Sequence, residues 1–132
     1  MTQYVYNSAD LRQPIDLSQQ EEFLLKQSST FCMLPWIHLH AYPTGEVWPC
    51  CAAEHDGMRA MPLGNARQQP LEQIWNSDRM QSLRQRMLNQ QQDPYCVRCY
   101  EREDAGFRSD RQSANKHHGH QIAKIHSTTS TG

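Results

Sequence analysis

The sequence is short of apolar residues and contains no long apolar run. Only 37% of its 132 residues are hydrophobic, and no stretch approaches the length needed to cross a membrane. The N-terminal residues also lack the basic and apolar regions of a secretory signal. We therefore expect a single-domain protein that is cytoplasmic and has no membrane partner.

An excess of charge of either sign is also absent. Thirteen Lys and Arg residues against fourteen Asp and Glu residues leave a formal net charge of -1. Domains that bind nucleic acid carry a basic patch or stripe, and the sequence shows none. We therefore expect no nucleic-acid partner.

Apolar residues gather between Phe31 and Phe107, and both ends of the chain are polar. A core built from so few residues is marginal by itself, so small domains of this kind often depend on a disulfide or a bound metal. Disulfides are rare in a reducing cytoplasm, and the five cysteines do not form a closed set of pairs. We therefore expect a bound metal to stabilise this small core.

The cysteines fall into two groups. Cys32, Cys50 and Cys51 lie in the first third of the apolar region, and Cys96 and Cys99 form a C-x-x-C pair. Thiolates are soft ligands that suit zinc and iron–sulfur clusters, so we expect Cys32, Cys50, Cys96 and Cys99 to hold one metal centre. Structural zinc sites often use two C-x-x-C pairs, and here there is one. The residues alone leave an iron–sulfur cluster and a zinc ion open.

Local patterns predict a small α+β fold, in which a β-hairpin, an amphipathic helix and loops are stapled by a metal cluster. Alternating apolar and polar residues predict the hairpin over residues 36–49, with its turn at Pro43-Thr44-Gly45. This hairpin would bring Cys50 back toward Cys32. Residues 52–69 are expected to form a loop.

One helix is predicted over residues 70–90, because apolar side chains recur there at helical spacing and Pro70 suits the first helical position. Arg84 is expected on its solvated face. A second helix is expected within residues 100–118, interrupted by Gly106. The tryptophans are expected to wall the metal centre and exclude water, a role that is compatible with packing in the core: Trp36, Trp48 and Trp75.

Specific sequence motifs accompany the two groups of cysteines and lie between them. Cys32 is followed by Pro35-Trp36, and the spacing C-x12-G-x4-C runs through Gly45 to Cys50. The later motifs are Leu63-Gly64-Asn65, the helix start Pro70-Leu71-Glu72-Gln73-Ile74-Trp75-Asn76-Ser77 and the C-x-x-C pair. With these features the segment from Phe31 to Phe107 resembles the auxiliary-cluster domain, called twitch or SPASM, of radical S-adenosylmethionine (radical SAM) proteins.

The resemblance implies that Cys32, Cys50, Cys96 and Cys99 ligate one [4Fe–4S] cluster, as in the shorter, twitch version of the domain. Cys51 is the alternative to Cys50 and is otherwise expected to be a small buried residue. The implied function is that of an accessory domain that relays electrons or positions a substrate peptide. The alternative is a structural or protein-interaction module held by one Zn2+, without a redox role.

The motif that generates the radical, C-x-x-x-C-x-x-C, does not occur in the sequence, which is also too short for the barrel that carries it. We therefore expect no complete enzyme in this chain. The resemblance implies a radical SAM barrel in cis or in trans, and a peptide or protein substrate. The expected domains are a polar leader over 1–30, with a short helix or one docked turn, a twitch- or SPASM-like domain over 31–108, and a polar tail or linker to the missing barrel over 109–132.

Overall fold

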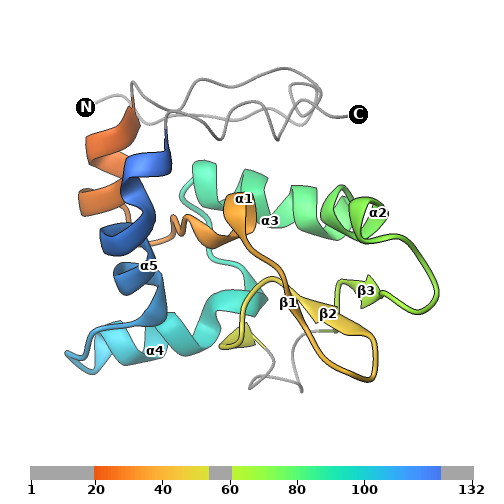
Figure 1. Ribbon diagram of the computed structural model, residues 1–132. Coiled ribbons are helices and arrows are strands. Elements are labelled where there is room, and N and C mark those ends of the chain that lie inside the picture. The colour runs from red at the N-terminus through yellow and green to blue at the C-terminus, as the bar shows by residue number, and fades with distance from the viewer. Residues whose placement is uncertain (1–19, 54–60, 123–132) are drawn as a thin grey trace.

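A computed structural model describes residues 20–53 and 61–122 and shows a three-stranded antiparallel sheet among helices (Figure 1). The predicted small α+β class is confirmed, whereas stapling by a metal cluster stays a prediction. None of the helices in the described residues has the length and hydropathy to cross a membrane. In chain order the elements are η3 (Phe23–Gln27), α1 (Leu34–Ile37), β1 (His40–Ala41), β2 (Glu46–Trp48), β3 (Gly64–Asn65), α2 (Leu71–Trp75), α3 (Asp78–Leu88), η5 (Pro94–Cys96), α4 (Val97–Asp104) and α5 (Asp110–His118).

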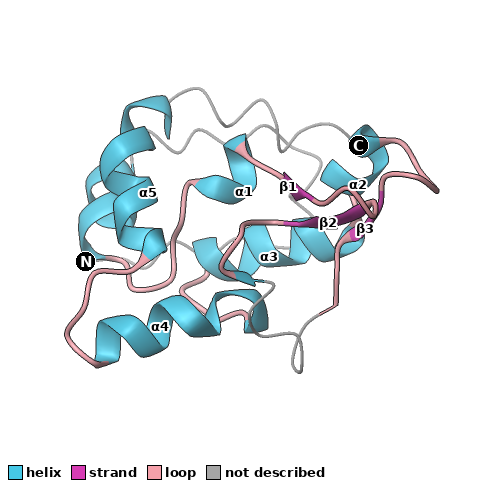
Figure 2. Cartoon of the chain, turned by 60° about the horizontal axis from the view of Figure 1, so that its bottom comes forward, coloured by secondary structure: helices cyan, strands magenta, loops and turns pink. Residues whose placement is uncertain are grey.

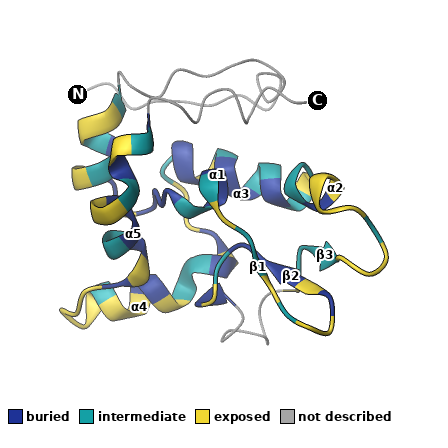
Figure 3. Cartoon of the chain, viewed as in Figure 1, coloured by how far each residue is buried: buried dark blue, intermediate teal, exposed yellow. Residues whose placement is uncertain are grey.

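The strands lie at one end of the molecule and α4 and α5 at the other (Figures 1 and 2). α1 packs on α3, and α5 packs on η3. Most of the buried apolar residues form one cluster between these elements, and buried segments are dark in Figure 3. The largest fully buried side chains of the described residues are Trp36, Tyr95, Phe31, Leu24, Met33, Ile74, Met80, Leu83, Met87 and Leu88.

The hairpin is confirmed, with β1 paired to β2 so that His40 faces Trp48. Its turn is closed by a hydrogen bond from the Gly45 N–H to the Tyr42 carbonyl oxygen at 2.8 Å. Gly45 has a positive φ of 99°, and a Cβ there would overlap the side chain of Asn65. Only glycine fits this position without strain.

The first strand is shorter than predicted, because Leu34–Ile37 is the helix α1. Pro35 lies in its first turn, where a proline costs no hydrogen bond, and alternation over so few residues does not distinguish a strand from a helix. The expected loop over 52–69 also contains β3, which pairs Gly64 with Val47. A two-residue strand carries no periodic signal.

The single helix predicted over residues 70–90 is wrong, since the structure has α2 and α3 in its place. Ser77 separates them and caps α3, because its side chain accepts a hydrogen bond from the Met80 N–H. Pro70 precedes α2 with an extended backbone and is not its first helical residue. The local cap at Ser77 therefore outweighs the continuous apolar stripe.

Arg84 does not lie on a solvated face. It is 3% exposed, and its Nε donates a hydrogen bond to the Pro35 carbonyl oxygen at 2.9 Å. Its guanidinium group lies over the ring of Trp75, 4.6 Å from the ring centre. Arg84 thereby ties α3 to α1 and α2.

The expected interrupted helix after residue 100 is two helices, α4 and α5, with Gly106 at a positive φ of 87° between them. Ser109 begins α5 with a reciprocal capping box to Gln112. Asn115 then accepts a hydrogen bond from the Met33 N–H and donates one to the Phe31 carbonyl oxygen, each at 2.9 Å.

Part of the segment that we assigned to the tail therefore packs beside Cys32. The division at residues 30 and 108 stays a prediction. The first nineteen residues of the polar leader and the end of the tail lie outside the described residues.

Candidate metal centre

The structure brings the four predicted ligands together. Cys32, Cys50, Cys96 and Cys99 line one small cavity. Cys32 precedes α1, Cys50 follows β2, and the other two begin α4, where Cys96 is the N-cap residue. Segments that lie far apart in the sequence thus supply thiols to the same space.

The remaining wall of this cavity is almost entirely apolar. None of the described residues that line it is a tryptophan, so the expectation that the tryptophans wall the centre is wrong. Trp36 instead stacks on Phe31, and Trp48 meets the edge of Tyr95. The other lining residues are Leu34, Pro35, Pro49, Leu83, Met87, Tyr95, Asp110 and Arg111.

The four thiols are poor acids in this setting. Burial raises the pKa of Cys50 to about 11 and raises the pKa values of Cys32, Cys96 and Cys99 above their ordinary value. The nearness of the other thiols raises the pKa values of Cys32 and Cys96 further. A group of thiolates is therefore stable here only with a cationic centre among them.

Hydrogen-bond donors nevertheless reach each sulfur. Backbone N–H groups serve three of them, and the Tyr100 hydroxyl hydrogen-bonds the fourth. Such donors stabilise negative charge on sulfur and tune a bound metal centre. The donors are Leu34 to Cys32, Ala52 and Ala53 to Cys50, Asp110 and Arg111 to Cys99, and Tyr100 to Cys96.

Arg111 is a residue of this site that the sequence analysis did not find. It is 5% exposed, and its Nε and Nη2 donate hydrogen bonds to the two carboxylate oxygens of Glu103 at 2.8 and 2.6 Å. Its Nη1 donates to the carbonyl oxygens of Ser28 and Phe31, each at 2.9 Å. Arg111 therefore joins α4, α5 and the segment before Cys32 at the wall of the cavity.

The same network sets the charge of Glu103. Burial opposes ionisation of this carboxyl group, but hydrogen bonds from Arg111 and Ser109 outweigh that effect and hold its pKa below the ordinary 4.5. The capping-box residues Ser109 and Gln112 are a sequence signal for the start of α5. The burial of Arg111 has no comparable local signal.

A comparison with protein families decides the family. The model of the SPASM iron–sulfur cluster-binding domain matches residues 32–100. The chain belongs to this family. No curated protein and no solved structure matches the chain. The matched range contains all four cavity cysteines and confirms the resemblance found in the sequence.

The SPASM match identifies the chain as an iron–sulfur cluster-binding domain, and it ends before α5. Asp110 and Arg111 therefore belong to the cavity of this chain without belonging to the matched range. Among the described residues, no three His, Cys, Asp or Glu side chains converge closely enough to hold a single metal ion. The four thiols instead surround a cavity.

Cys51 has a different place in the SPASM domain from the one expected. It is exposed and does not line the cavity, so the expectation that it is a buried core residue is wrong. The alternating faces of a strand apply only as far as Trp48, where β2 ends. In the turn that follows, Cys50 is the residue at the cavity and Cys51 faces solvent.

Proposed function

We propose that Cys32, Cys50, Cys96 and Cys99 ligate one [4Fe–4S] cluster, and that the chain is an accessory domain of a radical SAM enzyme. The observation that supports this most directly is the single cavity lined by these four cysteines. Four cysteine thiolates are a complete ligand set for a cluster of this kind. The membership of the SPASM family supports the same assignment.

The residues around the thiols fit an anionic iron–sulfur centre. Leu83, Met87 and Tyr95 exclude water from the cavity, and limited solvent access is one factor that sets the reduction potential of a cluster. The N–H and O–H donors at the four sulfurs are another. When bound, a [4Fe–4S] cluster would exchange single electrons, which supports a role in electron relay.

We place this role beside a radical SAM barrel, in cis within a longer protein or in trans on another chain, because the sequence holds no C-x-x-x-C-x-x-C motif. Positioning of a peptide or protein substrate is the second role that the SPASM family suggests. The five cysteines are free, which fits a reducing compartment such as the cytoplasm.

The metal content of the protein tests this proposal directly. We expect about four irons and four sulfides per chain after purification without oxygen, with a broad brown absorbance. About one zinc and no sulfide per chain would contradict the proposal. That result would support a zinc-held interaction module without a redox role.

Removal of the cluster should also destabilise the fold. The thiols come from three segments, so the free energy of metal binding contributes to the free energy of folding. We expect treatment with an iron chelator and an oxidant to lower the thermal unfolding midpoint by at least about 10 °C. Circular dichroism would record the unfolding, and re-formation of the cluster should restore the midpoint. An unchanged midpoint after complete loss of iron would show that the centre does not hold the fold together.

A further inference from the structure

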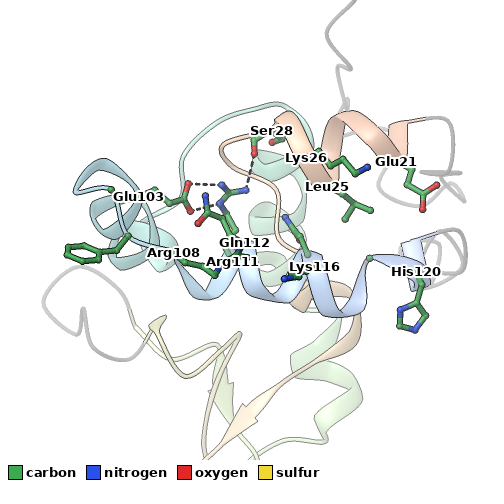
Figure 4. A pocket seen from close by; sticks show the side chains of 14 residues that line it. Glu21, Leu25, Lys26, Ser28, Glu103, Arg108, Arg111, Gln112, Lys116 and His120 are labelled. Atoms are coloured by element: carbon green, nitrogen blue, oxygen red, sulfur yellow. Dashed lines mark hydrogen bonds and ion pairs between the residues drawn. The ribbon is translucent and has the colours of Figure 1, made fainter.

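A groove of about 770 Å3 lies between η3, α5 and the turn that joins α4 to α5 (Figure 4). None of the cysteines lines it, so it is a feature separate from the proposed cluster site. Its lining includes Leu25 and the polar residues Gln112 and Asn115. A groove of this size can hold a short stretch of a ligand.

Cations from three different elements line the groove. Lys26 comes from η3, Arg108 from the turn between α4 and α5, and Lys116 from α5, and all three are exposed. Figure 4 shows Lys26 and Lys116 on the two helices that face each other across the groove. Within the described part of the chain, no carboxylate forms an ion pair with any of the three.

The acidic groups of the groove do not neutralise these cations. The carboxylate of Glu103 is bound by the guanidinium group of Arg111. Glu21 lies at the end of the groove where His120 also lies (Figure 4). Positive charge therefore remains along the length between Lys116 and Arg108. At the Arg108 end the side chain of Phe107, which is 62% exposed, adds an apolar surface.

We propose that this groove binds an acidic segment of a partner polypeptide. Carboxylates of that segment would pair with Lys26, Arg108 and Lys116, and an apolar side chain beside them would pack on Phe107. A polypeptide fits better than a nucleic acid, because Glu21 would repel an uninterrupted phosphate backbone. An acidic peptide can place its charges where the cations are and neutral residues elsewhere.

The position of the groove connects it to the metal centre. Arg111 lines both the groove and the cysteine cavity. A segment bound in the groove would thus lie one side chain away from the cysteine cavity. The inference itself rests on the side chains of the groove and does not require a cluster.

The test is binding of a fluorescein-labelled peptide to the full chain. The probe has about ten residues, with three Asp or Glu residues, one Phe and neutral residues elsewhere, and its affinity is measured by fluorescence anisotropy at low salt. We expect the wild type to bind it and the double variant Lys26→Glu/Lys116→Glu to bind at least about tenfold more weakly, because two ion pairs become repulsive. Added salt should weaken the wild-type complex.

The double variant Arg67→Glu/Arg98→Glu is the matched control. It makes the same change in net charge at two exposed arginines that do not line the groove, and we expect it to bind within about threefold of the wild type. Equal weakening in both double variants would overturn the proposal. So would a wild type that does not bind the peptide, or one that binds an oligonucleotide of equal charge more tightly. Iron measured on the same samples separates this test from that of the cluster.

Discussion

Replacing Cys96 or Cys99 with alanine is expected to reduce bound iron from about four atoms per chain to less than about one. Each variant removes one of the four thiols that line the cavity, and an incomplete ligand set leaves an iron without a protein ligand. We expect the same result for Cys32→Ala and Cys50→Ala. Iron and sulfide analysis of protein purified without oxygen gives the measurement.

Cys51→Ala is the control for this series. It removes a thiol from the residue next to Cys50, but Cys51 is exposed and lies outside the cavity. We expect this variant to keep about four irons and the absorption spectrum of the wild type. Loss of iron from Cys51→Ala, together with full iron in Cys50→Ala, would exchange the roles of the two neighbours and contradict the ligand set proposed here.

The second large effect is expected at Arg111. Arg111→Met should destabilise the protein by about 3 kcal/mol, because it leaves the Glu103 carboxylate without its cation in a partly buried place. It also leaves the carbonyl oxygens of Ser28 and Phe31 without their donor. On a domain of this size such a loss corresponds to a fall of roughly 10 °C or more in the thermal unfolding midpoint.

Two further variants separate the ion pair from a general loss of packing. Arg98→Met removes an exposed arginine, and we expect its midpoint to stay within about 3 °C of the wild type. The double variant Arg111→Met/Glu103→Gln removes both charges, so it should recover part of the stability lost in Arg111→Met. A midpoint unchanged by Arg111→Met would show that this network does not hold α5 against the segment before Cys32.

The candidate ligands and the hairpin could be predicted from the sequence, because each depends on residues that are close together in the chain or on a recognisable spacing of residues. The turn at Pro43-Thr44-Gly45 follows from backbone preferences that each residue carries by itself. The C-x12-G-x4-C spacing and the C-x-x-C pair led to the SPASM family, which the family comparison confirmed. The distinction between Cys50 and Cys51 also started from that spacing, through Gly45.

Errors in the sequence reading arose where two local preferences compete. The apolar stripe over residues 70–90 predicts one helix, but the Ser77 side chain supplies a cap that starts a new one. Ile37 fits a strand because it alternates with His38 and Leu39, and it fits a helix because Pro35 suits a first helical turn. Contacts with the rest of the chain decide between such alternatives, and a short window does not contain them.

By itself, the sequence of this SPASM domain determined which cysteines are candidate metal ligands and which turn brings Cys50 back toward Cys32. Only the tertiary structure decided that they share a cavity, and that the start of α5 forms part of its wall. It also decided that Arg84 and Arg111 are buried. The reason is that a buried arginine is stable only beside acceptors for its hydrogen bonds, which are carbonyl oxygens or a carboxylate. Those of Arg111 include the carbonyl oxygens of Ser28 and Phe31, about eighty residues earlier in the chain.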